Sequence, residues 1–391
     1  ELAETQVRRM TGADLLGQGW GKRQGRDNPC PDDGRPWSDL GARPSGFASI
    51  IVVNHNGGAL LHACLESLTN DLRPGDEIIL VDNASTDGSA RAAERAFPAV
   101  RVLCSLTNLG FGGGNNLGAR HATGEYLAFI NPDTVVAPGW LMSLVSALEE
   151  DASAGLATSK VLLLQDPSRI NTCGNEVHCS GLALCRGMGQ DQEMLAEMAE
   201  VGAVSGAAFV MRRELFEMLG GFDESFFLYM EDTDLSWRAQ LLGYRCLYVP
   251  DSVIYHDYAL RFGPLKTFYQ ERNRYLMLLK ALRWRSLFVL SPALLLAEIV
   301  TWGFVLSRER RHVGNKVRAY GWLVRNWSPV MEKRRQTQVS RRQEDRSLIE
   351  RTGYRLMYEQ TGQGPVARLA QVVFDPTFRV LRGMALGLIR W

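Results

Sequence analysis

The sequence predicts an α/β protein in which a mostly parallel sheet is flanked by helices and followed by a C-terminal helical region. Three observations support this fold class. Short apolar runs alternate with helical patterns between residues 48 and 150, as expected for a parallel sheet covered on both faces. Polar residues stand directly after several of these runs, where open α/β sheets bind ligands. After residue 256 the pattern becomes helical and basic.

The spacing of apolar residues sets the individual elements. Strands are expected at residues 48–53, 77–81, 100–103, 126–130 and 246–249, with another inside 202–212. Helices are expected at residues 60–72, 89–97, 115–123, 138–150, 213–219, 232–242, 268–281 and 286–306. Pro138 favours a helix start at the beginning of residues 138–150. Gly220-Gly221 ends the helix expected at residues 213–219. Residues 155–205 show a less regular pattern, so no element is predicted there.

Three regions are expected along the chain. Residues 1–46 form an extension, flexible or loosely docked, because Gly, Pro and charged residues dominate them. Residues 47–260 form the sheet domain, and residues 261–391 a basic, partly hydrophobic helical region. The seven cysteines show no CxxC pair, which argues against zinc and favours free thiols in a reducing compartment. No secretory signal is recognisable, so export is not expected.

The formal charge of +1 conceals an asymmetry between the two parts of the chain. Residues 257–391 carry 25 Lys and Arg against 10 Asp and Glu, whereas residues 1–256 carry 19 against 33. A basic half favours an anionic surface as its partner, and a solvated Arg-rich helix is the alternative. Residues 286–306 hold one charge, Glu298, and one proline. We favour a helix lying in a membrane interface over a membrane span or a soluble core helix.

Polar residues at the ends of predicted strands indicate a site for a nucleotide diphosphate. Asp82 follows the second strand, where a carboxylate can accept hydrogen bonds from a ribose hydroxyl or a base N–H. A Gly- and Asn-rich loop at residues 108–116 would let backbone N–H groups approach a phosphate. Helix capping and a flexible turn are the alternatives for these segments. The candidate nucleotide-sugar-binding residues are Asn54, Asn56, Asp82, Asn83, Asn108, Gly112, Asn115, Asn116, Asn131 and Asp133.

Two acidic motifs carry the remaining chemistry. Asp133, in Asn131-Pro132-Asp133, can give an oxygen ligand to a hard cation that bridges two phosphates. Glu231 and Asp232 open a predicted helix, where a positioned carboxylate can take the proton of an acceptor hydroxyl. Helix capping is the alternative for this pair. His256 follows a strand-like run and is either a metal ligand or a structural histidine.

In this order, these motifs resemble the inverting family-2 glycosyltransferases with the GT-A fold, strongly over residues 48–256 and moderately over 268–342. The resemblance is closest to the bacterial rhamnosyltransferase-like branch. It implies that Asp82 contacts the nucleotide, that Asp133 and His256 bind Mg²⁺ or Mn²⁺, and that the base is Asp232, beside Glu231. The residues implied at the acceptor pocket are Gly206, Ala207, Tyr229 and Trp237. Asn131 stands where many relatives have Asp, which leaves one carboxylate in the metal motif.

The resemblance also implies a function. A metal-dependent, inverting hexosyltransferase would move a sugar, in this branch L-rhamnose from dTDP-rhamnose, to a lipid-linked or polysaccharide acceptor in cell-surface glycan assembly. Alternatives are a UDP-sugar donor, a polyprenyl-phosphate acceptor, and a catalytically idle membrane-bound module that binds sugar nucleotides. The expected location is the cytoplasmic face of the bacterial inner membrane, and the C-terminal helices allow a homo-oligomer. Nucleic acid is excluded as a partner because the basic region lacks an interleaved aromatic recognition motif.

Overall fold

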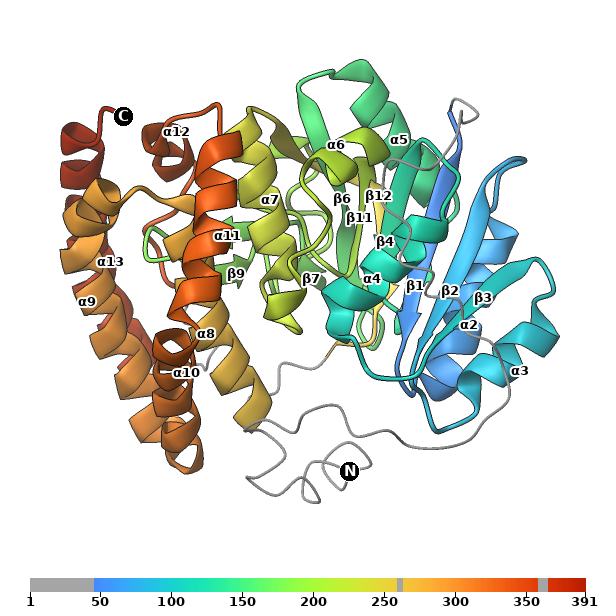
Figure 1. Cartoon of the computed structure of the whole chain (residues 1–391), viewed down its shortest axis with the longest axis horizontal. Coiled ribbons are helices and arrows are strands. Elements are labelled where there is room, and N and C mark those ends of the chain that lie inside the picture. Colours follow the sequence, from blue (N-terminus) through green and yellow to red (C-terminus); the bar gives the residue numbers. More distant parts are fainter. Residues whose placement is uncertain (1–45, 259–262, 358–364) are drawn as a thin grey trace. The chain divides into compact units, whose positions relative to one another are not determined.

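The computed structural model describes residues 46–258, 263–357 and 365–391 (Figure 1). All but the last residue of the predicted extension therefore lie outside the described residues. The sheet and the C-terminal helices belong to one compact unit, so a domain boundary near residue 260 stays a prediction.

A ten-stranded mixed sheet organises the first part of the chain, in the order β10-β12-β6-β11-β4-β1-β2-β3. Four parallel strands form one side: β1 (Ala48–Asn54), β2 (Glu77–Asn83), β3 (Val100–Ser105) and β4 (Tyr126–Ile130). Antiparallel β11 (Ala208–Arg212) joins β4 to β6 (Ala154–Leu163), and β12 (Arg245–His256) runs parallel to β6. Short strands complete the structure: β5 (Thr134–Val136), β7 (Ile170–Thr172), β8 (Asn175–Val177), β9 (Ala183–Cys185) and β10 (Ala199–Glu200).

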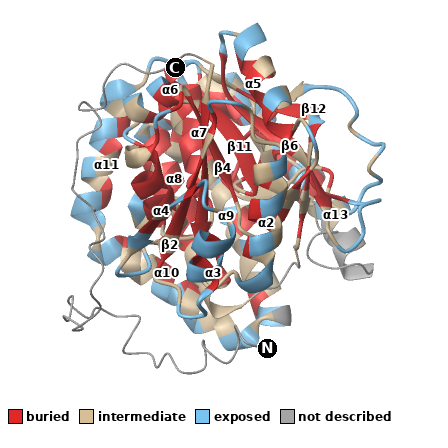
Figure 2. Ribbon diagram, turned by 90° about the vertical axis from the view of Figure 1, so that its right-hand side faces the viewer, coloured by how far each residue is buried: buried red, intermediate tan, exposed pale blue. Residues whose placement is uncertain are grey.

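Helices cover both faces of this sheet because successive strand residues point to opposite sides. Ile50, Val52 and Ala128 pack with α2 (Gly58–Asn70), α3 (Ser89–Ala96) and α5 (Trp140–Glu150) on one face. Ile51, Val53 and Phe129 pack with α4 (Gly110–His121), α6 (Arg213–Met218) and α7 (Glu231–Leu242) on the other. The central strands β1 and β4 are accordingly buried along their whole length, whereas the edge strand β3 is partly exposed (Figure 2).

Three sequence-based predictions need correction. Residues 154–163, nearly all in the stretch with the less regular pattern, form the long inner strand β6, whose Thr158 and Ser159 are buried but hydrogen-bonded. The separate strand runs at 246–249 and 253–255 form one strand, β12, with a register irregularity between Val249 and Val253. The helix predicted from residue 115 begins at Gly110, so the predicted glycine-rich loop is mostly helical.

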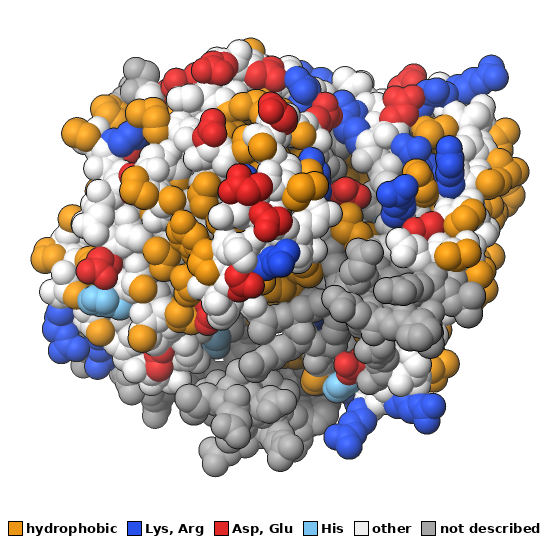
Figure 3. Space-filling view, turned by 180° about the vertical axis from the view of Figure 1, so that it is seen from behind, with side chains coloured by type: hydrophobic (Ala, Val, Ile, Leu, Met, Phe, Trp, Pro, Cys, Tyr) orange, Lys and Arg blue, Asp and Glu red, His pale blue; other side chains and the backbone are white. Residues whose placement is uncertain are grey.

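The C-terminal region is helical, as predicted. Its long helices are α8 (Pro264–Ala281), α9 (Trp284–Arg308), α10 (Val313–Arg325), α11 (Trp327–Ser340) and α13 (Pro365–Leu388), with the short α12 (Asp345–Glu350). Buried residues of α7 and α8, including Trp237 and Leu276, form one apolar cluster with residues of α9 to α13. Seen from behind, hydrophobic side chains line the edge that carries α9 and α13 (Figure 3).

Candidate active site

The ends of the parallel strands bring several predicted nucleotide-binding residues to one edge of the sheet. Asn54 at the end of β1 lies opposite Asp82 at the end of β2. The Asn54 amide donates to Ser85 Oγ at 3.0 Å, and Asp82 Oδ1 accepts from the Ser85 N–H at 3.0 Å. Asn56 Oδ1 accepts from the Thr86 N–H at 2.7 Å. The two loops are thereby fixed to each other, while Asp82 and Asn56 stay partly exposed.

The glycine-rich segment has a structural role that the sequence analysis did not foresee. A Cβ at Gly114 would lie 2.6 Å from Val53 Cγ1, and a Cβ at Gly112 would lie 3.0 Å from Phe222 Cβ. These glycines let α4 pack directly against its neighbours, which larger residues would prevent. Asn116 Nδ2 donates to Phe222 O at 3.0 Å and to Glu224 Oε1 at 2.9 Å.

Four of the predicted nucleotide-sugar-binding residues have internal contacts in the structure. All four are buried, and their side chains or their missing side chains serve packing and hydrogen bonding inside the protein: Asn83, Gly112, Asn115 and Asn116. Asn83, for example, donates to Asn108 Oδ1 and Gly110 O at 3.1 Å each, which holds the turn after β3. Asn108 remains exposed at this turn.

The two predicted metal ligands meet. His256 Nε2 lies 3.2 Å from Asp133 Oδ1, because β5 and β12 pair His256 with Thr134. His256 Nδ1 is 2.9 Å from Asn171 Oδ1. With Nδ1–H donating to that oxygen, Nε2 presents its lone pair, the usual arrangement of a metal-bound histidine. Asp133 Oδ1 is buried without a hydrogen-bond partner, which suits a cation ligand.

A cation held here would need further ligands from elsewhere. Within the described residues, no group of three or more His, Cys, Asp and Glu side chains could hold a metal. Mg²⁺ commonly keeps several waters and takes one or two protein ligands together with phosphate oxygens. Asp133 and His256 fit such a shared site. The bound cation would supply positive charge against a departing diphosphate.

The acidic pair at the start of α7 divides into two chemically different carboxyl groups. Burial raises the pKa of Glu231 to about 8, and the neighbouring charge of Asp232 adds to the shift. Glu231 Oε2 is buried and lacks a hydrogen-bond partner. Burial also raises the pKa of Asp232, but N–H groups of Gly206 and Thr233 stabilise its ionised form. Glu231 Oε2 has no donor that would stabilise a negative charge, whereas the Asp232 carboxylate accepts hydrogen bonds from two N–H groups, which makes Asp232 the better candidate base.

A short segment before β11 connects the two halves of the site. The Ala207 carbonyl accepts from the Asn131 N–H at 3.0 Å. The adjacent Gly206 N–H donates to Asp232 Oδ2 at 2.8 Å, and Asn175 Nδ2 lies 3.2 Å from the same oxygen. The metal motif and the candidate base thus share one structural support.

Among the predicted acceptor residues, Trp237 lies in the protein interior. It is 3% exposed and lies in the apolar cluster between α7 and the C-terminal helices, because its position on α7 faces the protein interior. Tyr229 is partly exposed beside Lys266, whose Nζ lies 5.6 Å from the ring centroid. Sequence reasoning missed Asn171 and Asn175, since both lie in the stretch without a regular pattern.

Comparisons with known proteins identify the family of this chain. A family model described as Glycosyl transferase family 2 matches residues 49–220. An N-acetylglucosaminyl-diphospho-decaprenol L-rhamnosyltransferase of Mycobacterium tuberculosis is 30% identical over 245 residues, covering 55% of this chain and 77% of the relative. The chain belongs to glycosyltransferase family 2. This family-2 enzyme is rhamnosyltransferase-like and acts on nucleotide sugars.

Solved structures confirm the GT-A fold. S. aureus TarS 1-349 in complex with UDP-GlcNAc matches with a TM-score of 0.52 and 18% identity, covering 86% of this chain and 90% of that one. GalNAc-T7 with UDP, GalNAc and Mn²⁺ matches with a TM-score of 0.50 and 19% identity over 59% of this chain. The match spans 47% of the GalNAc-T7 chain.

The acidic pair gives a first prediction. We expect Asp232→Asn to lower kcat by about 10²- to 10⁴-fold, the usual contribution of a general base, with donor Kd unchanged. Glu231→Gln should keep most of the activity at pH 7, because an amide resembles the protonated carboxyl group. Steady-state kinetics and donor titration measure both effects. A larger loss in Glu231→Gln than in Asp232→Asn would exchange the two roles.

A second prediction concerns the cation. We expect Asp133→Ala and His256→Ala each to weaken binding of the donor diphosphate and to abolish its strengthening by Mn²⁺. Isothermal titration with and without EDTA measures this. Asp251→Ala, an exposed acid on the same strand as His256, serves as the control and should behave like wild type. Donor binding that is equally tight in EDTA would contradict the metal role.

Proposed function

We propose that this enzyme transfers L-rhamnose from dTDP-rhamnose, with inversion, to a hydroxyl of a lipid-linked acceptor during assembly of a cell-surface glycan. The similarity to the mycobacterial rhamnosyltransferase, which extends over 77% of that relative, is the observation that carries this proposal. The arrangement of Asp133, His256 and Asp232 supports a metal-assisted direct displacement. In that reaction the base takes the proton of the acceptor hydroxyl while the diphosphate departs on the opposite side.

A donor screen by thermal stabilisation tests the proposal. A ligand at 100 times its Kd stabilises the folded state by about 2.7 kcal/mol, so the true donor should stand out among nucleotide sugars. We expect dTDP-rhamnose with Mn²⁺ or Mg²⁺ to give the largest shift. NMR of the product would then show whether the anomeric configuration is inverted. Stabilisation by UDP-sugars instead would favour the alternative donor, and binding without any turnover would favour an idle binding module.

We also propose that the enzyme works at the cytoplasmic face of the inner membrane, attached through α9 and α13. The part of α9 from Trp284 to Ser307 is long and apolar enough to cross a membrane. Yet only 22% of the residues in its most apolar 18-residue stretch are buried. A core helix of a soluble protein would be mostly buried. Exposed apolar side chains run along both helices: Trp284, Phe288, Leu295, Ile299, Leu306, Val372, Val373, Val380, Met384 and Leu388.

The charged residues around α9 support attachment in the plane of the membrane rather than a membrane span. Glu298, at the middle of α9, accepts from Tyr320 at 2.6 Å and pairs with Arg274 of α8. The middle of α9 is therefore tied to charged helices that a bilayer core would exclude. The other acid of these two helices, Asp375, is buried, whereas Arg285, Arg379 and Arg390 are exposed. An apolar face with exposed arginines complements an anionic leaflet.

Liposome flotation tests the attachment. We expect the wild-type protein to float with anionic liposomes and to be released only partly by high salt, because the apolar contribution is not screened. The triple variant Phe288→Ser, Leu295→Ser, Ile299→Ser should stay in the soluble fraction. A triple Ser variant of Leu106, Met142 and Met218, which are exposed on the sheet domain, should still float. Absence of the wild-type protein from all floated fractions would overturn the proposal.

A further inference from the structure

The loop that precedes α7, the helix that carries Glu231 and Asp232, has an unusual backbone. Three non-glycine residues just before α7, Phe227, Tyr229 and Met230, have φ values of 59°, 68° and 68°. L-amino acids rarely adopt such conformations, and they persist only where surrounding structure enforces them. The next two residues are Glu231 and Asp232. The orientation of the candidate base therefore depends on whatever holds this loop.

Helix α8 holds it. The fully buried Asn273 side chain lies with Nδ2 at 3.0 Å from Phe226 O, 2.9 Å from Leu228 O and 2.7 Å from Tyr229 O. Its neighbour Arg272 donates from Nη2 to Ser225 O at 2.6 Å and to Phe226 O at 2.7 Å. Two consecutive side chains of α8 thus bind the carbonyl groups of the strained loop.

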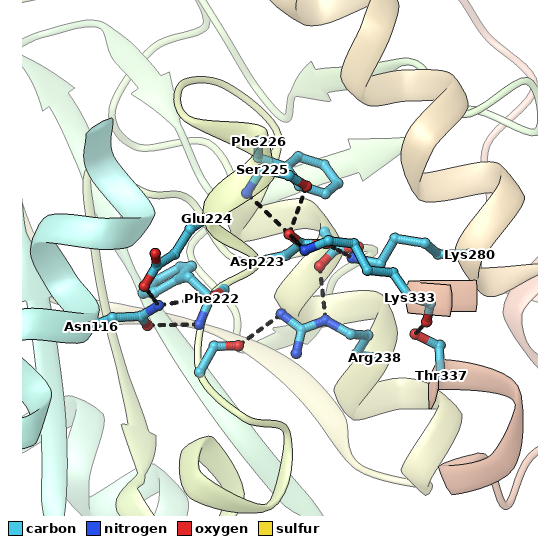
Figure 4. Close-up of polar contacts among 12 residues, drawn as sticks. Asn116, Phe222, Asp223, Glu224, Ser225, Phe226, Arg238, Lys280, Lys333 and Thr337 are labelled. Atoms are coloured by element: carbon cyan, nitrogen blue, oxygen red, sulfur yellow. Dashed lines mark hydrogen bonds and ion pairs between the residues drawn. The ribbon is translucent and has the colours of Figure 1, made fainter. Parts of the chain in front are cut away.

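A buried ionic bridge makes a second connection (Figure 4). Lys280 Nζ of α8 lies 2.8 Å from Asp234 Oδ1 on α7 and 2.5 Å from Asp223 Oδ2, before the loop. Arg238 Nε lies 2.7 Å from the other oxygen of Asp234, and Lys333 of α11 pairs with Asp223. Although burial would raise the pKa of Asp223, Lys280 and Lys333 hold it well below its usual range. Asp234 stands two residues after Asp232 on the same helix.

We propose that α8 is part of the catalytic machinery, with Asn273 and Lys280 as positioning residues that set the orientation of Asp232. This inference rests on the proposed role of Asp232 as the base, but not on the identity of the sugar. The nucleotide edge of the sheet, around Asp82, is built mainly from β1, β2 and the loops that follow them. Loss of the α8 contacts should therefore lower turnover while leaving donor binding intact, because only the carboxylate loses its orientation.

The chain contains a matched control for Lys280. Lys316 of α10 is also fully buried and also bridges two carboxylates, at 2.9 Å from Glu271 and 3.4 Å from Glu298. This second bridge joins α8 to α9 and α10, whereas the Lys280 bridge joins α8 to α7. Lys280→Met and Lys316→Met remove the same charge from equivalent surroundings, so both should lower Tm.

The experiment compares kcat and donor Kd for the nucleotide sugar that gives the largest shift in the donor screen, with a GlcNAc-diphosphate-lipid analogue as acceptor, at a temperature well below the lowest Tm. We expect Asn273→Ala and Lys280→Met to lower kcat at least tenfold while donor Kd changes less than twofold. Lys316→Met should keep kcat within about twofold of wild type. Lys280→Arg, which retains the charge, should recover most of the lost kcat. If Lys280→Met does not fold, Lys333→Met, at a partly exposed position, should show a smaller loss of the same kind.

Amide hydrogen exchange gives a readout that does not depend on activity. We expect Asn273→Ala to accelerate exchange in residues 226–234 and to leave the strand ends around residue 82 unchanged. Equal losses of kcat in Lys280→Met and Lys316→Met, with no change in the loop, would reduce α8 to a purely stabilising role and overturn the inference. Full activity of Asp232→Asn would instead refute the proposed base, which is a separate result.

Discussion

The hydrogen bond from the Gly206 N–H to Asp232 Oδ2 is the contact around which the rest of the site is built. The residue after Gly206, Ala207, accepts a hydrogen bond from the Asn131 N–H in the predicted metal motif. One short segment therefore holds both the candidate base and the predicted metal motif. A Cβ at Gly206 would lie 3.2 Å from that carboxylate oxygen, and a neighbour would have to move to admit it. The antiparallel strand β11 delivers this segment, and the loop before α7 presents the carboxylate to it.

Candidate residues whose positions follow from strand ends could be predicted from the sequence. Asp82, Asp133 and His256 each stand after an apolar run, and parallel strands must bring such positions to one edge. The strand β6 could not be predicted from the sequence, because Thr158 and Ser159 are polar and their buried hydrogen-bond partners are known only from the structure.

The internal contacts of other candidate residues could not be predicted for a related physical reason. Gly112 and Trp237 are predicted to contact ligands, since sequence alone cannot distinguish a ligand surface from close packing between elements. A Cβ at Gly114 would collide with Val53, a fact that depends on the distance between α4 and β1. Asn171, Asn175 and Asn273 had no signal at all, because a lone asparagine has no characteristic spacing.

The charge asymmetry of the chain has a partly internal explanation. Several basic residues of the C-terminal region, among them Lys280 and Lys333, pair with Asp223 and Asp234 of the acidic half. Arg272 is buried against backbone carbonyl groups. An excess of positive charge in one part of a sequence can thus neutralise another part of the same protein. The arginines that remain exposed on α9 and α13 are the ones available to an outside partner.

The apolar cluster shared by α7 and α8 to α13 sets a limit on how this enzyme can be shortened or recombined. A chain cut near residue 260 would expose Phe226, Met230 and Trp237 to water and leave Asp223 and Asp234 without Lys280 beside them. Such a fragment would contain every motif recognisable in the sequence and still lack a folded catalytic helix. Chimaeras that exchange acceptor specificity between relatives would have to take α7 and the C-terminal helices from the same parent protein.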